Sequence, residues 1–263
     1  MDYGHRYGVE GLGRRGVSFI ERTGGLSVMA GRYLVALKDI PRSISLIIDQ
    51  LYVIGVKSLP VIMVIAVFVG AVSAWQAAYQ FKFIGAPLRY LGQAVGKATV
   101  IELAPVLSGL VFAGRVGAGI TAELGTMRVT EQIDALDAMG ISPYRYLMMP
   151  RVLVCTLMLP FLVIFANFIA ILGGLAVAVF GVDISNEMFL DGFKASFQLS
   201  DFVNGLIKAG VFGFLIGLVG CYEGFHAEGG AEGVGHATTN SVVISSVLIL
   251  VFNFVFAIIL FRV

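Results

Sequence analysis

The sequence VLVCTLMLPFLVIFANFIAILGGLAVAVFG, residues 152–181, contains no charged side chain. A helix of roughly 20 apolar residues crosses the hydrocarbon core of a bilayer, so this stretch is long enough to span it with some tilt. The whole chain has the same character, because 58% of its residues are hydrophobic and 13% are charged, whereas a soluble domain carries about 25% charged residues. We therefore expect an all-α integral membrane protein.

Four other segments share this apolar character and bring the prediction to about five transmembrane helices. The predicted spans cover residues 53–75, 100–121, 152–181, 203–222 and 241–261. The second span is the least hydrophobic, because it contains Glu102, Pro105 and Arg115. A chain of 263 residues has room for one such bundle and for no additional soluble catalytic domain.

The chain divides into an N-terminal region and a transmembrane region. Residues 1–50 are predicted to form a cytoplasmic N-terminus and interfacial amphipathic helices, since apolar residues recur at helical spacing on both sides of Pro41. Residues 51–263 are predicted to form the transmembrane permease domain. The first 16 residues have neither an apolar core nor a small-residue cleavage site, so we expect no removable signal peptide.

The distribution of lysine and arginine predicts the orientation in the membrane. Seven of these residues precede the first span, and Arg128, Arg145 and Arg151 lie between the second and third spans. The segments on the other side contain fewer, namely Lys82, Arg89, Lys97 and Lys194. This bias places the N-terminus in the cytoplasm and the C-terminus outside.

Two ionisable residues lie inside predicted spans, Glu102 in the second and Lys208 in the fourth. Charged groups are costly in lipid and usually face a water-filled cavity or an opposite charge. Both residues fall near the extracytoplasmic ends of their spans, so they can pair with each other or meet a zwitterionic headgroup. The alternative is that both are boundary residues that extend into water.

Glycine recurs at steps of three and four residues along the fourth span, which places a stripe of small residues on one helix face. The stripe consists of Gly210, Gly213, Gly217, Gly220 and Gly224. Small residues allow two helix backbones to approach closely in a membrane. The stripe therefore predicts close packing, either within the chain or at the seam of a homodimer.

A short helix of about ten residues is predicted within residues 130–140. Thr130 can cap its N-terminus and Gly140 can end it. The helix presents apolar and acidic side chains together, namely Glu131, Ile133, Asp134, Leu136, Asp137 and Met139. An isolated helix of this length is marginal, so we favour a docking element for a cytoplasmic partner over a simple connector.

The sequence has no pattern expected of an enzyme that acts alone. It lacks the G-x-x-x-x-G-K-[ST] motif that binds ATP phosphates. His5, His226 and His236 are too scattered to predict a metal site, and Cys155 and Cys221 have no C-x-x-C spacing and are interpreted as packing residues. A net charge of +1 gives no indication of nucleic-acid binding. We expect no cofactor and no metal in this chain.

Two motifs resemble the signature of the MlaE/YrbE permease family. These are Glu102-Leu-Ala-Pro and LVFAGRVGAGITAELGTMRVTEQIDALDAMGISPYRYLMMPR, residues 110–151. The likeness extends from Gln50-Leu-Tyr-x-x-Gly to Ala237-Thr-Thr-x-x-Val-x-x-Ser-Ser and covers most of the chain. Members of this family are the membrane subunits of ABC transporters that work with MCE-domain proteins.

The resemblance implies a homodimer in the bacterial inner membrane that transports phospholipid and contributes to the lipid asymmetry of the outer membrane. It implies a cytoplasmic ABC ATPase that binds ATP and magnesium, a STAS-type accessory protein, and a periplasmic MCE-domain partner. Residues 130–140 would be the coupling helix in the ATPase, and Glu102 and Lys208 match positions near the lipid-binding cavity. The chain departs from the family at Ile101, where relatives often have arginine.

Two other functions are compatible with a membrane bundle. An ion-coupled secondary transporter would need paired broken helices and acidic relay residues deep in the membrane, and the sequence has no two-fold repeat of that kind. A non-transporting scaffold would merely anchor other subunits. The residues leave the direction of transport and the headgroup preference open.

Overall fold

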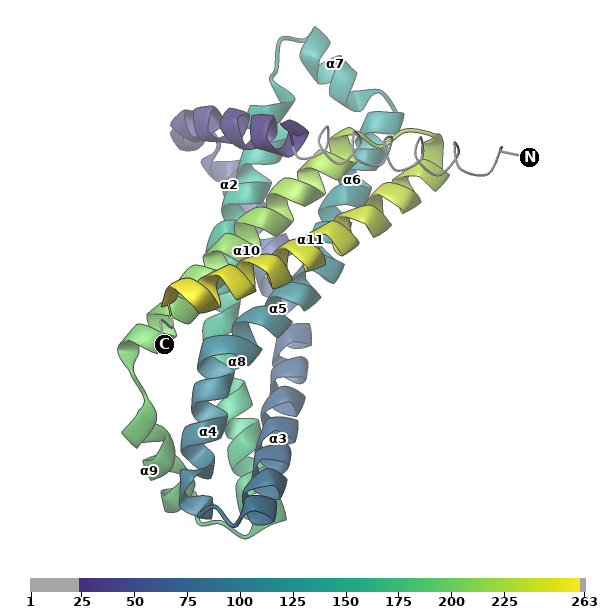
Figure 1. Ribbon diagram of the computed structural model, residues 1–263. Helices are drawn as coiled ribbons and strands as arrows, with labels where there is room; N and C mark the ends of the chain where they lie inside the picture. The colour runs from purple at the N-terminus through teal and green to yellow at the C-terminus, as the bar shows by residue number, and fades with distance from the viewer. Residues whose placement is uncertain (1–23, 261–263) are drawn as a thin grey trace, which may run out of the picture.

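The computed structural model describes residues 24–260, except for the side chains of residues 39 and 42. This part of the chain consists of helices joined by short turns and contains no strand (Figure 1). Five segments are long and apolar enough to cross a membrane: Ile44–Ile84, Leu88–Val129, Tyr144–Val182, Leu199–Phe225 and Gly230–Leu260. The prediction of an all-α protein with five spans is confirmed. Residues 1–23 and the predicted end of the last span at residue 261 lie outside the described residues.

The first two spans are composite helices, longer than predicted. The first contains α2 (Ile44–Gln50), the π-turn η2 (Leu51–Gly55), the 3₁₀ turn η3 (Val56–Ser58) and α3 (Leu59–Ile84). The second contains η4 (Leu88–Tyr90), α4 (Leu91–Ala98), η5 (Thr99–Leu103), α5 (Ala104–Phe112), η6 (Ala113–Gly117) and α6 (Ala118–Val129). Both η5 and η6 are π-turns. A π-turn widens the helix locally and often marks a functional position, and here the two turns contain Glu102 and Arg115.

The other three spans form the rest of the bundle. They are built from η7 (Tyr144–Met148) with α8 (Met149–Val182), from α10 (Leu199–Phe225) and from α11 (Gly230–Leu260). The short helices α7 (Gln132–Ala138) and α9 (Asn186–Ser196) lie at opposite ends of the molecule (Figure 1). Helix α10 packs against α6, α8 and α11, so it occupies the centre of the bundle.

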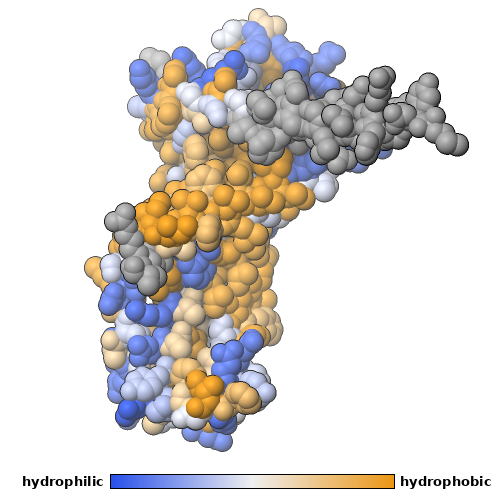
Figure 2. Space-filling view, viewed as in Figure 1, coloured by the Kyte–Doolittle hydropathy of each residue, from blue (hydrophilic) through white to orange (hydrophobic). Residues whose placement is uncertain are grey.

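The apolar side chains explain this arrangement. The largest fully buried ones include Phe112, Leu124, Leu159, Phe212 and Ile216, which come from α5, α6, α8 and α10. A hydrophobic surface covers the middle of the molecule, and hydrophilic residues gather toward both ends (Figure 2). Such a belt is expected of a bundle whose middle lies in lipid.

The N-terminal helices agree with the predicted two-piece pattern. A helix over residues 24–36 crosses the upper end of the bundle (Figure 1). It buries Met29, Tyr33 and Ala36 and leaves Leu34 and Val35 exposed. The 3₁₀ turn η1 (Leu37–Arg42), which contains Pro41, then leads into α2 and the first span. The position of these helices at a membrane surface stays a prediction.

The glycine stripe of α10 packs within the chain. A Cβ atom on Gly213 would lie 2.2 Å from the carbonyl oxygen of Cys155 in α8, and one on Gly224 would lie 2.7 Å from Cβ of Leu124 in α6. The nearest neighbours of Gly210 and Gly217 also belong to α8, and those of Gly220 to η6 and α6. Of the two alternatives left open by the sequence, the structure uses the stripe for contacts inside one chain.

Candidate functional site

An ion pair inside the bundle joins the second and fourth spans. Nζ of Lys208 lies 2.6 Å from Oε1 of Glu102. The Lys208 side chain is fully buried, whereas 36% of the Glu102 side chain is exposed. The sequence allowed these residues either to pair or to extend separately into water, and the structure pairs them.

The ammonium group of Lys208 has two further oxygen partners. It donates to the backbone oxygen of Ile101 at 3.4 Å and to Oδ1 of Asn253 at 3.3 Å. Asn253 belongs to α11, so three spans meet at one cation. A buried charge is expensive unless opposite charges and hydrogen bonds compensate it, which explains why three oxygens gather here. No role was predicted for Asn253, although an amide in an apolar span is a signal of one.

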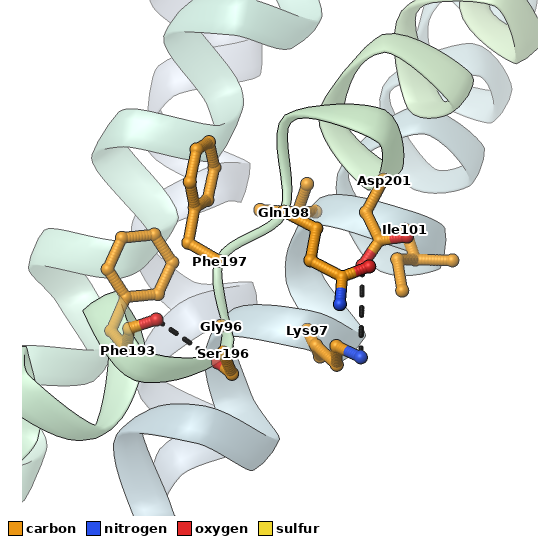
Figure 3. Close-up of a pocket in the computed structure, with 9 residues that line it drawn as sticks. Gly96, Lys97, Ile101, Phe193, Ser196, Phe197, Gln198 and Asp201 are labelled. Carbon is orange, nitrogen blue, oxygen red and sulfur yellow. Dashed lines mark hydrogen bonds and ion pairs between the residues drawn. The ribbon is translucent and has the colours of Figure 1, made fainter.

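A small pocket lies beside this ion pair, between η5 and the turn that joins α9 to α10 (Figure 3). Ile101 lines it, together with a second ion pair in which Nζ of Lys97 lies 3.9 Å from Oδ2 of Asp201. Asp201 Oδ2 is buried and has no hydrogen bond. Lys97 was considered only for orientation and this pair was not predicted, because pairing depends on the turn between α9 and α10 that brings Asp201 beside Lys97.

The predicted short helix is present as α7, but its beginning differs from the prediction. The prediction that Thr130 caps this helix is wrong, because the residue before α7 is Glu131, in a left-handed conformation with φ of 59°. The hydroxyl of Thr130 instead donates to the backbone oxygen of Thr126 at 2.7 Å, so it completes the end of α6. The helix is consequently seven residues long and not about ten.

The predicted end of α7 is confirmed. Gly140 has φ of 75°, which glycine adopts without steric cost. Its N–H donates to the oxygen of Asp137 at 2.9 Å, and the N–H of Ile141 donates to the oxygen of Leu136 at 2.9 Å. These two bonds form a Schellman motif, which satisfies carbonyl groups at a helix end.

The six residues singled out on α7 and its flanks do not share one face. Ile133 is buried and Leu136 is partly buried, so both face the bundle. Met139 and the acidic residues Glu131, Asp134 and Asp137 are exposed, and Asp134 pairs with Arg128. The exposed part of α7 and its flanks therefore combines acidic side chains with Met139 and two alanines, and Ile133 and Leu136 anchor the helix to the bundle.

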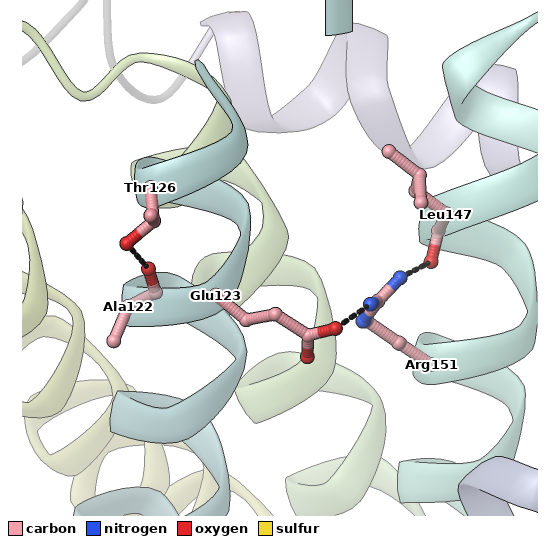
Figure 4. A network of polar contacts seen from close by, with 5 residues as sticks. All are labelled: Ala122, Glu123, Thr126, Leu147 and Arg151. Carbon is pink, nitrogen blue, oxygen red and sulfur yellow. Dashed lines mark hydrogen bonds and ion pairs between the residues drawn. The ribbon is translucent and has the colours of Figure 1, made fainter. Parts of the chain in front are cut away.

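Another ion pair lies where this segment meets the bundle (Figure 4). Nη2 of Arg151 lies 2.6 Å from Oε1 of Glu123, and Nη1 donates to the oxygen of Leu147 at 2.8 Å. Arg151 belongs to α8 and is buried, whereas Glu123 belongs to α6. The pair ties the helix that enters α7 to the helix that leaves it. The sequence analysis used Arg151 only for orientation.

No site for a metal emerges from residues 24–260, where no three histidine, cysteine, aspartate or glutamate side chains lie close enough to bind an ion. Cys155 and Cys221 are buried and unpaired with each other by a disulfide. The polar contacts inside the spans include ion pairs, the amide of Asn253 and hydroxyl groups such as that of Thr121, which donates to the oxygen of Gly220 at 3.1 Å. Five apolar spans around intramembrane ion pairs define a multi-pass membrane protein.

The chain belongs to the MlaE permease family, since the family model described as Permease MlaE matches residues 47–259. It is 41% identical over 252 residues to a probable ABC transporter permease protein of Rickettsia conorii, covering 96% of this chain and 97% of that protein. Proteins with the same description show 40% identity over 215 residues in Synechocystis sp. (82% and 81% covered) and 36% over 235 residues in Pyropia yezoensis (88% of each).

Proposed function

We propose that this chain is the permease subunit of an ATP-driven phospholipid transporter in the bacterial inner membrane. It works as a homodimer and moves lipid between that membrane and a periplasmic MCE-domain partner, and so contributes to outer-membrane lipid asymmetry. The observation that carries the proposal is the Glu102–Lys208 pair, a charged site inside an apolar bundle. Such a site suits a molecule with apolar tails and a charged headgroup.

The geometry of the pair supports binding by exchange. Lys208 is fully buried, but the carboxylate of Glu102 is partly exposed, so an ammonium group of a headgroup can reach Glu102 first. A phosphate can then take the place of the carboxylate beside Lys208. Replacing one anion by another keeps the buried ammonium compensated, whereas leaving it alone would be strongly unfavourable.

The departure at Ile101 fits a site in which Lys208 is the main cation. Ile101 supplies a backbone oxygen to Lys208 and lines the neighbouring pocket. The nearest additional cation in that pocket is Lys97, one helical turn before Ile101, and it is held only loosely by Asp201 at 3.9 Å. Lys97 therefore supplies the second positive charge on the path of the headgroup.

The energy comes from a separate ATPase, because the sequence has no motif for binding ATP and the relatives are described as probable ABC transporter permease proteins. Helix α7 docks on that ATPase through its exposed acidic side. The Arg151–Glu123 pair transmits the movement of α7 to α6 and α8. Both of these helices pack on the glycine stripe of α10. A STAS-type accessory protein completes the cytoplasmic assembly.

The arrangement of the ends supports the proposed orientation. Helix α7 and the helix over residues 24–36 lie at the same end of the bundle, and α9 lies at the other (Figure 1). The described part of the N-terminal region and the segment around α7 therefore lie at one end of the bundle, and the excess of arginine assigns that end to the cytoplasm in this proposal. Because the glycine stripe is occupied within the chain, the homodimer seam falls on α11, the least buried of the five spans, whose exposed face includes Val243, Val247 and Val251.

Mass spectrometry of the lipids retained by the purified complex tests the proposal. The wild-type complex should retain phospholipid, and Lys208→Ala should lower the retained amount about tenfold, the equivalent of one charge-assisted hydrogen bond, while the ATPase still co-purifies. Lys194→Ala, at an exposed position on α9, is the matched control and should change neither quantity. A scaffold or an ion-coupled transporter would leave lipid retention unchanged in Lys208→Ala, and that result would refute the proposal.

A further inference from the structure

Arg115 is an intramembrane cation that the functions described so far do not use. It lies in the π-turn η6, within the second span, and it is exposed. Its Nη1 donates to the hydroxyl oxygen of Ser58, and that hydroxyl in turn donates to the oxygen of Ile54. A guanidinium has five N–H donors, and in the part of the chain that the structure describes no acidic side chain lies within ion-pair distance of it.

The depth of Arg115 follows from its neighbours. A Cβ atom on Gly25 would touch Tyr222 of α10, and one on Gly224 would touch Thr121 and Leu124 of α6. Gly25, at the start of the helix over residues 24–36, therefore lies near the level of Thr121, and the Tyr33 ring of that helix lies 5.7 Å from the Phe214 ring of α10. Arg115 precedes Thr121 by six residues, which is about 9 Å along a helix. Arg115 therefore lies about 9 Å further into the bundle than Thr121, in the half of the bundle that carries α7. From this depth a long side chain can extend to the headgroup region.

An apolar seam continues from Arg115 toward the middle of the bundle. A narrow pocket between α3 and α5 is lined by Ile62, Ile65 and Val69 on one side and by Leu107 and Val111 on the other. Ser58 precedes Ile62 by four residues, and Val111 precedes Arg115 by four, so the polar pair lies about one helical turn beyond the pocket. Arg115, which has N–H donors in addition to the one that binds Ser58, therefore lies at one end of this apolar pocket.

The surface beside Arg115 is open within this chain. A Cβ atom on Gly114 or on Gly119 would meet no heavy atom within 4 Å. If this face lay at the two-fold axis of a homodimer, two Arg115 side chains would meet, because a residue at the axis faces its own copy. Two uncompensated guanidinium groups in lipid repel each other, so the charge favours an anionic occupant.

We propose that Arg115 and Ser58 bind the phosphate of a phospholipid from the cytoplasmic leaflet. One acyl chain of this lipid then lies along the opening of the apolar pocket between α3 and α5. The planar guanidinium matches phosphate oxygens in a bidentate manner, and the pocket between α3 and α5 offers apolar side chains to the acyl chain. This inference rests on the proposed function in one respect: it makes the Arg115 site the point where lipid is accepted or delivered on the cytoplasmic side. It is separate from the Glu102–Lys208 site.

Photo-crosslinking tests this site. A benzophenone amino acid at position 119, four residues from Arg115, is placed in the complete transporter complex in nanodiscs of phosphatidylethanolamine and phosphatidylglycerol. The expected result is a phospholipid adduct whose yield falls about tenfold in Arg115→Gln, the equivalent of one charge-assisted hydrogen bond, and much less in Arg115→Lys. The same probe at position 168, an exposed position on α8 outside the proposed dimer seam, should give adducts that do not depend on Arg115.

Three outcomes would overturn the inference. They are a wild-type probe at position 119 that forms no lipid adduct while position 168 does, an adduct to a second copy of the chain, and a lipid adduct that Arg115→Gln leaves undiminished. Lys208→Ala separates this inference from the proposed function, because it should empty the Glu102–Lys208 site and leave the adduct at position 119 intact. An adduct that persists while Lys208→Ala fails to change lipid retention would refute the proposed function alone.

Discussion

Removing the Glu102 carboxylate should destabilise the bundle, and removing Lys208 as well should restore it. In Glu102→Gln the ammonium of Lys208 stays fully buried and keeps neutral oxygen acceptors such as those of Ile101 and Asn253, but it loses the carboxylate charge beside it. Breaking a buried pair costs about 3–5 kcal/mol, and we reduce this to about 2 kcal/mol because 36% of the Glu102 side chain is exposed and water can partly replace it. The double variant Glu102→Gln with Lys208→Met removes the buried charge and should lie within about 1 kcal/mol of wild type.

The assay is a double-mutant cycle of unfolding free energy in detergent, combined with lipid retention in the same four proteins. We expect Glu102→Gln to be the least stable protein and the double variant to recover stability without recovering lipid, since its site has no charge left for a headgroup. A double variant that is as unstable as Glu102→Gln would contradict the claim that the uncompensated charge of Lys208 causes the loss of stability. A double variant that retains lipid like wild type would show that the pair is structural and does not bind the headgroup.

Three other predictions concern packing and coupling. Gly213→Leu should prevent the chain from folding, because a Cβ there would lie 2.2 Å from the Cys155 oxygen, while Gly114→Leu should fold, since a Cβ there meets nothing within 4 Å; size-exclusion profiles compare the two. Gly140→Val should lower the free energy of unfolding by about 1–2 kcal/mol, because valine is strained at the φ of 75° found there. It should also weaken ATPase binding by loosening α7, and ATPase binding equal to wild type would contradict this. Replacing Glu131 and Asp137 by lysine should reduce co-purification of the ATPase, and undiminished assembly would count against α7 as the docking element.

The features predicted correctly from the sequence depend on patterns that lie within one segment. Long apolar runs predicted five spans, because a bilayer requires helices of a minimum length. Gly140 predicted a helix end because only glycine readily takes the left-handed conformation that such an end needs. Glu102 and Lys208 were recognised because ionisable residues in apolar spans need partners.

The features that were missed depend on contacts between segments. Thr130 has the composition of a cap, but its hydroxyl completes the end of α6 at Thr126, and the sequence gives no way to choose between these two partners. The Lys97–Asp201 and Arg151–Glu123 pairs join residues far apart in the chain. Their formation depends on how separate helices pack against one another, which no pattern within one segment reveals.

The most direct test of the central claim is ATP-dependent movement of a labelled phospholipid in proteoliposomes that contain the reconstituted complex. The account predicts lipid movement that requires the ATPase subunit, disappears in Lys208→Ala and persists in Lys194→Ala, while the purified chain alone hydrolyses no ATP. Lipid movement that continues at the wild-type rate in Lys208→Ala, or ATP hydrolysis by this chain alone, would contradict it.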